Sequence, residues 1–70
     1  MRMKVNKLDD GSLMITATQD MANGEYAYAR LPVSKDDSSD LDVIAAASAA
    51  CAINLASQFP SKFLGAQQVH

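Results

Sequence analysis

The chain has 70 residues, a formal net charge of −2, a pI of about 4.9 and a single cysteine. A chain of this length forms one small domain, which buries only about 60% of its unfolded surface and is marginally stable alone. A single cysteine excludes an internal disulfide, no His/Cys cluster has zinc-ligand spacing, and the acidic balance argues against direct binding of nucleic acid. We therefore expect no metal and no cofactor, and we expect oligomerisation to supply the missing stability.

Neither a signal peptide nor a membrane span is expected. The basic residues at the start of the chain are not followed by an apolar stretch. The uncharged run 43–59 is shorter than the roughly 20 residues that cross a bilayer, and it includes several polar side chains. A lone reduced cysteine is typical of the cytoplasm. The sequence thus predicts a soluble, cytoplasmic protein without membrane contact.

The first third of the chain predicts two strands joined by a tight turn. Apolar and polar residues alternate over 1–8, which is the pattern of a half-buried strand. The turn residues Asp9-Asp10-Gly11 follow, because glycine accepts the positive φ that such a turn needs. Residues 12–18 alternate again and are rich in β-branched side chains, so they form the second predicted strand.

A third strand is predicted after a second turn. Asn23-Gly24 is the preferred pair for a two-residue type I′ turn. Residues 19–22 either extend the second strand or belong to a longer loop. The third strand covers 25–31, and Pro32 is expected to end it because proline cannot donate to the ladder. Three strands joined by two short turns make an antiparallel meander.

The second half of the chain predicts one long helix. A polar linker, 33–40, leads into it, with Ser39 as the expected N-cap and Asp42 completing a capping box. Pro60 ends the helix at about Phe59, and 60–70 form a short tail. The predicted fold class is α+β, a single domain 1–70 in which a three-stranded antiparallel meander (about 1–32) is followed by a C-terminal helix (about 40–59) packed on one face (βββα).

The predicted helix has two uncharged faces. Its bulkier residues form a stripe that we expect to pack on the sheet: Leu41, Ile44, Cys51, Leu55 and Phe59. The face of the sheet that receives this stripe is expected to consist of Met3, Val5, Leu13, Ile15, Ala17, Ala27, Ala29 and Leu31. A second, mostly small-residue face is predicted to contact the helix of another subunit through Ala46, Ala49, Ala50, Ile53 and Ser57. The alternative is an exposed helix that is rich in alanine because alanine is the best helix former.

Two surfaces are candidates for binding a partner or ligand. Tyr26, Tyr28 and Arg30 share the outer face of the third strand, and tyrosine and arginine dominate binding hot spots. Their rings could also stack on a base, or the residues could only stabilise the sheet through cross-strand pairs. Asp36 and Asp37 lie in the acidic linker, where they either cap and solubilise the helix or form an acidic docking patch.

No catalytic residue is predicted. Cys51 is the one nucleophile candidate, but it lies mid-helix on the sheet-packing stripe, where a small buried core residue is expected. The surrounding AAASAACAIN resembles the cysteine-bearing helix of OsmC-like peroxidases over about ten residues. The chain is too short for the dimeric fold and the second cysteine of that family, so its activity is not expected here.

The sequence favours a small, non-enzymatic, oligomeric interaction protein. It would bind itself through the helix and another protein through the exposed sheet face or the acidic loop. A phage-type inhibitor of a host defence or of a nucleic-acid-handling complex is one such role. The alternative is an oligomer that binds a nucleotide-like small molecule at subunit interfaces. A thiol enzyme that uses Cys51 ranks last.

Overall fold

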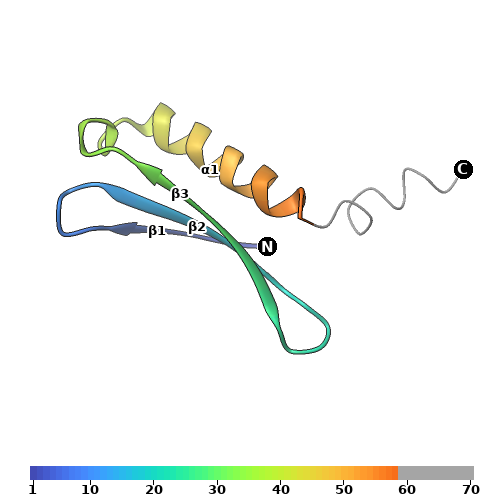
Figure 1. The fold of residues 1–70 in the computed structure, drawn as a ribbon. Coiled ribbons are helices and arrows are strands. Elements are labelled where there is room, and N and C mark those ends of the chain that lie inside the picture. Colours follow the sequence, from blue (N-terminus) through green and yellow to red (C-terminus); the bar gives the residue numbers. More distant parts are fainter. Residues whose placement is uncertain (59–70) are drawn as a thin grey trace, which may run out of the picture.

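The structure, a computed structural model, describes residues 1–58 (Figure 1). The order of its elements is β1 (Arg2–Lys7), β2 (Leu13–Asp20), β3 (Tyr26–Val33), the 3₁₀ turn η1 (Lys35–Asp37) and α1 (Leu41–Ala56). The strands form one antiparallel sheet in the order β1-β2-β3, and α1 packs along one face of it. The predicted βββα architecture is confirmed.

The first hairpin is closed by a three-residue loop. Leu8 N donates to Ser12 O at 2.8 Å, and Gly11 N donates to Leu8 O at 3.0 Å. Gly11 has a φ of 90°, a left-handed conformation that glycine adopts without strain. The Asp10 carboxylate also accepts hydrogen bonds from the hydroxyl and the backbone N–H of Ser12. Because these bonds favour the charged form, they lower the pKa of Asp10 below its usual value.

The second hairpin has the same kind of turn, which differs from the predicted one. Met21 N donates to Glu25 O at 2.8 Å, and Gly24 N donates to Met21 O at 3.2 Å, so the loop again has three residues. A type I′ turn needs positive φ at both of its central residues, but Asn23 does not have it and Gly24 does, at 87°. The Asn23 side chain instead accepts a hydrogen bond from Glu25 N at 3.1 Å.

Two strand ends differ from the predicted ones. Gln19 and Asp20 belong to β2 and Ala22 belongs to the loop, so residues 19–22 are divided between the two assignments that the sequence left open. Pro32 does not end β3, which continues to Val33. Because β3 is an edge strand, alternate N–H groups along it point away from β2, and proline can occupy such a position without removing a ladder hydrogen bond.

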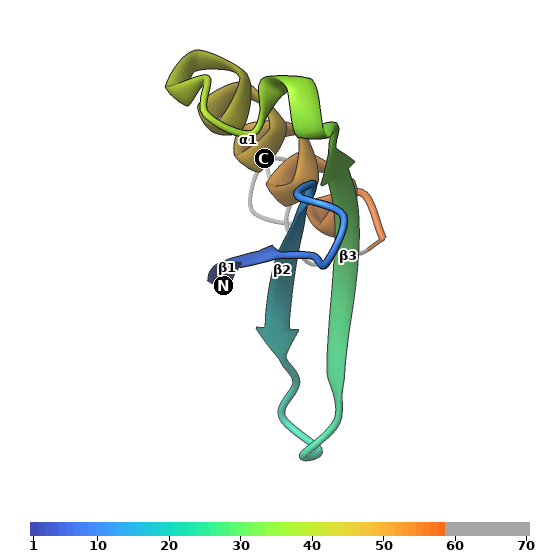
Figure 2. The same cartoon turned by 90° about the vertical axis from the view of Figure 1, so that its left-hand side faces the viewer.

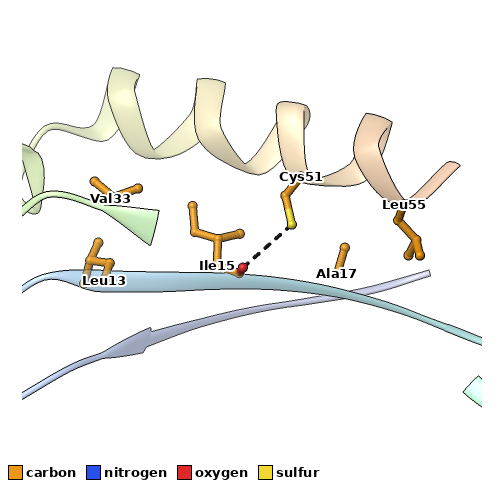
Figure 3. Packing of buried hydrophobic residues seen from close by; sticks show 6 residues of the cluster. All are labelled: Leu13, Ile15, Ala17, Val33, Cys51 and Leu55. Carbon is orange, nitrogen blue, oxygen red and sulfur yellow. Dashed lines mark hydrogen bonds between the residues drawn. The ribbon is translucent and has the colours of Figure 1, made fainter. Parts of the chain in front are cut away.

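The core lies between α1 and the strands β2 and β3 (Figure 3). Cys51 and Leu55 point from the helix toward the sheet, and the fully buried members of the sheet are Ile15 and Ala17. Small alanines on β2 and β3 let the helix approach closely. The complete buried cluster is Leu13, Ile15, Ala17, Val33, Cys51 and Leu55.

The helix covers less of the sheet than the sequence predicts. Met3 and Val5 pair with Ala17 and Ile15 and so lie on the helix-facing side, but their side chains stay 44% and 46% exposed. The reason is width, since one helix about 10 Å across covers two strands spaced at about 4.8 Å. Leu41 is also placed wrongly by the prediction, because as the first residue of α1 it is 79% exposed.

The helix begins and ends slightly inside its predicted limits. The N-cap is Asp40 and not Ser39, and an Asp40 carboxylate oxygen accepts from Asp42 N at 3.0 Å and from Val43 N at 3.3 Å. The helix ends at Ala56. The predicted contact of Phe59 and the predicted tail 60–70 lie outside the described residues.

Removing this cap has a defined expected cost. Asp40→Ala leaves two helix N–H groups without their side-chain acceptor, and we expect the free energy of unfolding to fall by about 1 kcal/mol. Urea unfolding followed by circular dichroism measures the change. Ser39→Ala is the matched control, because Ser39 makes neither capping bond, and it should change stability by less than about 0.5 kcal/mol. A larger loss in the control than in Asp40→Ala would place the cap at Ser39.

Candidate functional site

The face of the sheet opposite α1 presents three of the five predicted binding residues together, namely Tyr26, Tyr28 and Arg30. In the register, Lys4 pairs with Thr16, and Thr16 pairs with Arg30. The next row joins Arg2, Thr18 and Tyr28 in the same way. We call this surface the open face, and it consists of Arg2, Lys4, Asn6, Met14, Thr16, Thr18, Asp20, Tyr26, Tyr28, Arg30 and Pro32.

Aromatic and cationic side chains contact one another on the open face. The ring centroids of Tyr26 and Tyr28 lie 6.3 Å apart at an interplanar angle of 39°. The Arg30 guanidinium carbon lies 4.9 Å from the centroid of the Tyr28 ring, which is cation–π distance. Tyr26 and Tyr28 remain 64% and 49% exposed, so both rings offer apolar area to a partner. These contacts hold the side chains in place before any partner binds, which lowers the entropic cost of binding.

The open face is positively charged although the whole chain is slightly acidic. Arg2 forms an exposed ion pair with Asp20 at 3.0 Å, the only one among residues 1–58. Lys4 and Arg30 have no acidic partner within ion-pair distance in the same described region. An exposed pair such as Arg2–Asp20 adds little stability. The face therefore presents two uncompensated cations around the tyrosines.

The acidic residues of the linker lie at a different place in the fold. Asp36 and Asp37 are in η1, which follows the Val33 end of β3, whereas Tyr26 begins that strand (Figure 1). The Ser34 hydroxyl donates to an Asp37 carboxylate oxygen at 3.2 Å, and Asp37 N donates to Ser34 O, so this carboxylate has a local structural role. The structure therefore does not combine Asp36 and Asp37 with the tyrosines into one site.

The predicted self-association residues lie on the side of α1 that faces away from the sheet. Ala46, Ala49, Ile53 and Ser57 are exposed, and Ala50 is half-buried at the flank of the helix. Ile53 is 68% exposed, a large apolar side chain with no cover within the described chain. Four of the five predicted residues are thus accessible to a second subunit.

Cys51 lies where nucleophilic chemistry has no access. Its side chain is fully buried, and the thiol donates weakly to the carbonyl oxygens of Ala29 at 3.3 Å and Ile15 at 3.7 Å (Figure 3). A reactive cysteine needs partial exposure and a nearby base or cation. Within residues 1–58 no group of three His, Cys, Asp or Glu side chains could hold a metal ion.

One exposed surface was missed by sequence reasoning. Met3 and Val5 remain 44% and 46% exposed on the helix-facing side of the sheet, and Met1, just before β1, is 50% exposed. The signal was present in the sequence, since a single helix cannot cover three strands. We call Met1, Met3 and Val5 the β1 row.

Comparisons with protein-family models, with curated proteins and with solved structures found no match. None of the helices in the described part of the chain has the length and apolar character that crossing a membrane would require.

Proposed function

We propose that this chain is a non-enzymatic, homo-oligomeric interaction protein that binds another protein through its open face. The observation that carries the proposal is the contact between Arg30 and the exposed Tyr28 ring, 4.9 Å from guanidinium carbon to centroid, beside Tyr26. Tyrosine and arginine are the residue types most enriched among binding hot spots. An open antiparallel sheet face matches an extended protein surface better than it encloses a small molecule, since small-molecule sites are concave.

The charge of the open face defines the kind of partner that it favours. Lys4 and Arg30 are the uncompensated cations there, so the partner surface should carry carboxylates around an apolar centre that accepts the tyrosine rings. A small domain that occupies such a surface blocks it by occlusion. The proposed role therefore includes inhibition of a larger complex, for which a phage-type inhibitor is one setting.

Affinity capture from an extract of the cells in which the protein acts tests the proposal. Tyr28→Ala and Arg30→Ala should each reduce the amount of a specific captured protein by tenfold or more, because hot-spot truncation costs about 2 kcal/mol or more. Lys4→Ala should reduce capture less, and mainly at low salt. Lys35→Ala is the control, since Lys35 is an exposed cation in η1, away from the open face.

Two results would contradict the proposal. Capture that is unchanged in Tyr28→Ala and Arg30→Ala, with the variants folded by circular dichroism, would exclude the open face. Capture that is lost only when Asp36 and Asp37 are both changed to Asn would move the contact to the acidic loop.

A nucleotide-like ligand is the second candidate, and the Tyr28–Arg30 contact favours it. The Tyr28 ring can stack on a base, and the neighbouring Arg30 guanidinium can bind a phosphate. Titration with ATP, followed by tyrosine fluorescence, distinguishes the two functions. Saturable quenching that Tyr28→Ala abolishes would support the nucleotide function over the protein partner.

A further inference from the structure

The helix-facing side of the sheet carries an apolar surface that its own helix does not cover. Met3 and Val5 pair with Ala17 and Ile15, which α1 buries completely, yet both side chains of β1 remain nearly half exposed. In Figure 1, α1 lies over β2 and β3, and β1 is the strand furthest from the helix. The β1 row thus lies beside the helix and needs cover from outside the described chain.

The side of α1 that faces away from the sheet is also apolar and exposed. Beyond Asp42 this side has no charge, and its members are Ala46, Ala49 and Ile53. The small side chains of Ala46 and Ala49 let another surface approach the helix closely. Ile53 is the one large apolar side chain among them and is 68% exposed. We call Asp42, Ala46, Ala49 and Ile53 the outer helix face.

We propose that the chain forms a two-fold dimer in which the outer helix face of each copy packs on the β1 row of the other. The proposal rests on the self-association part of the proposed function and specifies its partner surface, which is a strand and not only a second helix. The two helices then lie side by side in one layer between two sheets. The outer helix face of each copy covers the β1 row of the other, so the same two surfaces meet twice, as an isologous interface requires.

The dimensions of the two surfaces agree. α1 lies over β2 and β3, so a second helix placed about 10 Å to the side lies over β1. In the proposed dimer, the two sheets face each other and the two helices lie side by side between them. The two-fold axis that relates the copies then runs along the helices, so the helices are parallel. At about 1.5 Å per residue, Asp42 to Ile53 spans about 16 Å. At about 3.3 Å per residue, the stretch of β1 from Lys7 to Arg2 spans a similar distance.

Charge complementarity supports the same alignment. The beginning of α1 lies at the end of the sheet where Val33 pairs with Leu13, and Leu13 pairs with Lys7 (Figure 3). In the parallel arrangement, Asp42 of one copy therefore approaches Lys7 of the other. Ile53 then falls against Met1 and Met3. One ion pair at the edge and one large apolar side chain in the apolar row fix the same register, and a partner of different sequence would have to reproduce both.

Sedimentation equilibrium over a series of concentrations tests the dimer. We expect wild type to sediment with twice the chain mass, and Met3→Lys and Ile53→Lys each to raise the dissociation constant at least about tenfold. Asn6→Lys is the matched control, since it adds the same charge to the same strand but on the open face, and it should leave the dimer intact.

Each other outcome overturns the inference in a distinguishable way. If Ile53→Lys dissociates the dimer and Met3→Lys does not, the helices associate without the β1 row, so the inference fails while helix-mediated self-association stands. If neither variant changes the mass, or wild type is monomeric, both fail. Dissociation by Asn6→Lys to the same extent would show that charge on β1, and not the covered face, is responsible.

A cross-link provides a second test that introduces no charge into the proposed interface. Chains carrying Met3→Cys and chains carrying Ile53→Cys, mixed and oxidised, should form a disulfide between copies, because a disulfide requires Cα atoms within about 7 Å. Asn6→Cys mixed with Ile53→Cys should not cross-link. The native thiol of Cys51 is buried and does not interfere. Equal cross-linking by the Met3 and Asn6 variants would contradict the proposed register.

Discussion

Ile15→Ala is expected to remove about half of the protein's free energy of unfolding. Ile15 is fully buried at the centre of the core, and a large-to-small change at such a position costs about 2–5 kcal/mol through lost burial and the cavity left behind. A domain of 70 residues has on the order of 4–10 kcal/mol in total. Urea unfolding measured by circular dichroism should show a midpoint shifted to much lower denaturant, or no folded baseline.

The control for this change is the next residue on the same strand. Met14 points to the open face and is only half-buried, so Met14→Ala should cost about 1 kcal/mol or less. Both variants must be compared at one protein concentration, since self-association couples stability to concentration. A loss for Met14→Ala that equals the loss for Ile15→Ala would show that the sheet buries both faces.

Cys51 is expected to react with thiol reagents only when the protein opens. Its side chain has no exposed surface and lies against the carbonyl groups of Ile15 and Ala29, so the reagent must wait for local or global unfolding. We expect the native rate to be at least about 100-fold below that of the unfolded chain, measured spectroscopically with an aromatic disulfide reagent in buffer and in urea.

An internal control makes this measurement quantitative. Ala22→Cys places a second thiol in the exposed loop between β2 and β3, which should react at the unfolded-chain rate in the native protein. A structural role for Cys51 would be contradicted if Cys51 reacted as fast as this loop thiol. The same holds if its rate rose with pH around a midpoint below the pKa of an ordinary thiol. Such a result would revive the thiol-enzyme hypothesis.

The sequence was sufficient for features that arise from local periodicity. Alternation identified the strands, glycine positions located both loops, and the helix followed from its uncharged, alanine-rich run. These signals depend on neighbours within a few residues. The α+β class and the order of elements could therefore be predicted.

Features that depend on how elements meet could not be predicted in the same way. Leu41 matches the buried stripe in helical phase, but phase alone does not show that the first residue of the helix lies beyond the core. Met3 and Val5 have the alternation of a buried strand face, yet the width of one helix decides that they remain uncovered. Pro32 was predicted to end β3, and it is tolerated because β3 is an edge strand.

The candidate site shows the same division. Alternation alone placed Tyr26, Tyr28 and Arg30 on one face, and the structure brings them together as expected. The alternation pattern could not show that Arg2 pairs with Asp20 while Lys4 and Arg30 have no acidic partner, since these pairings depend on strand register.

The order of the elements along the chain also determines how the protein can fold. Each strand pairs with the strand next to it in sequence through a three-residue loop, and α1 packs on the strands that immediately precede it. Contacts of this local kind close quickly, so we expect folding within milliseconds and without a populated intermediate. During synthesis, however, the helix is made after all three strands. The meander alone has no partner for Ile15 and Ala17, and so the chain should remain unfolded until α1 has left the ribosome.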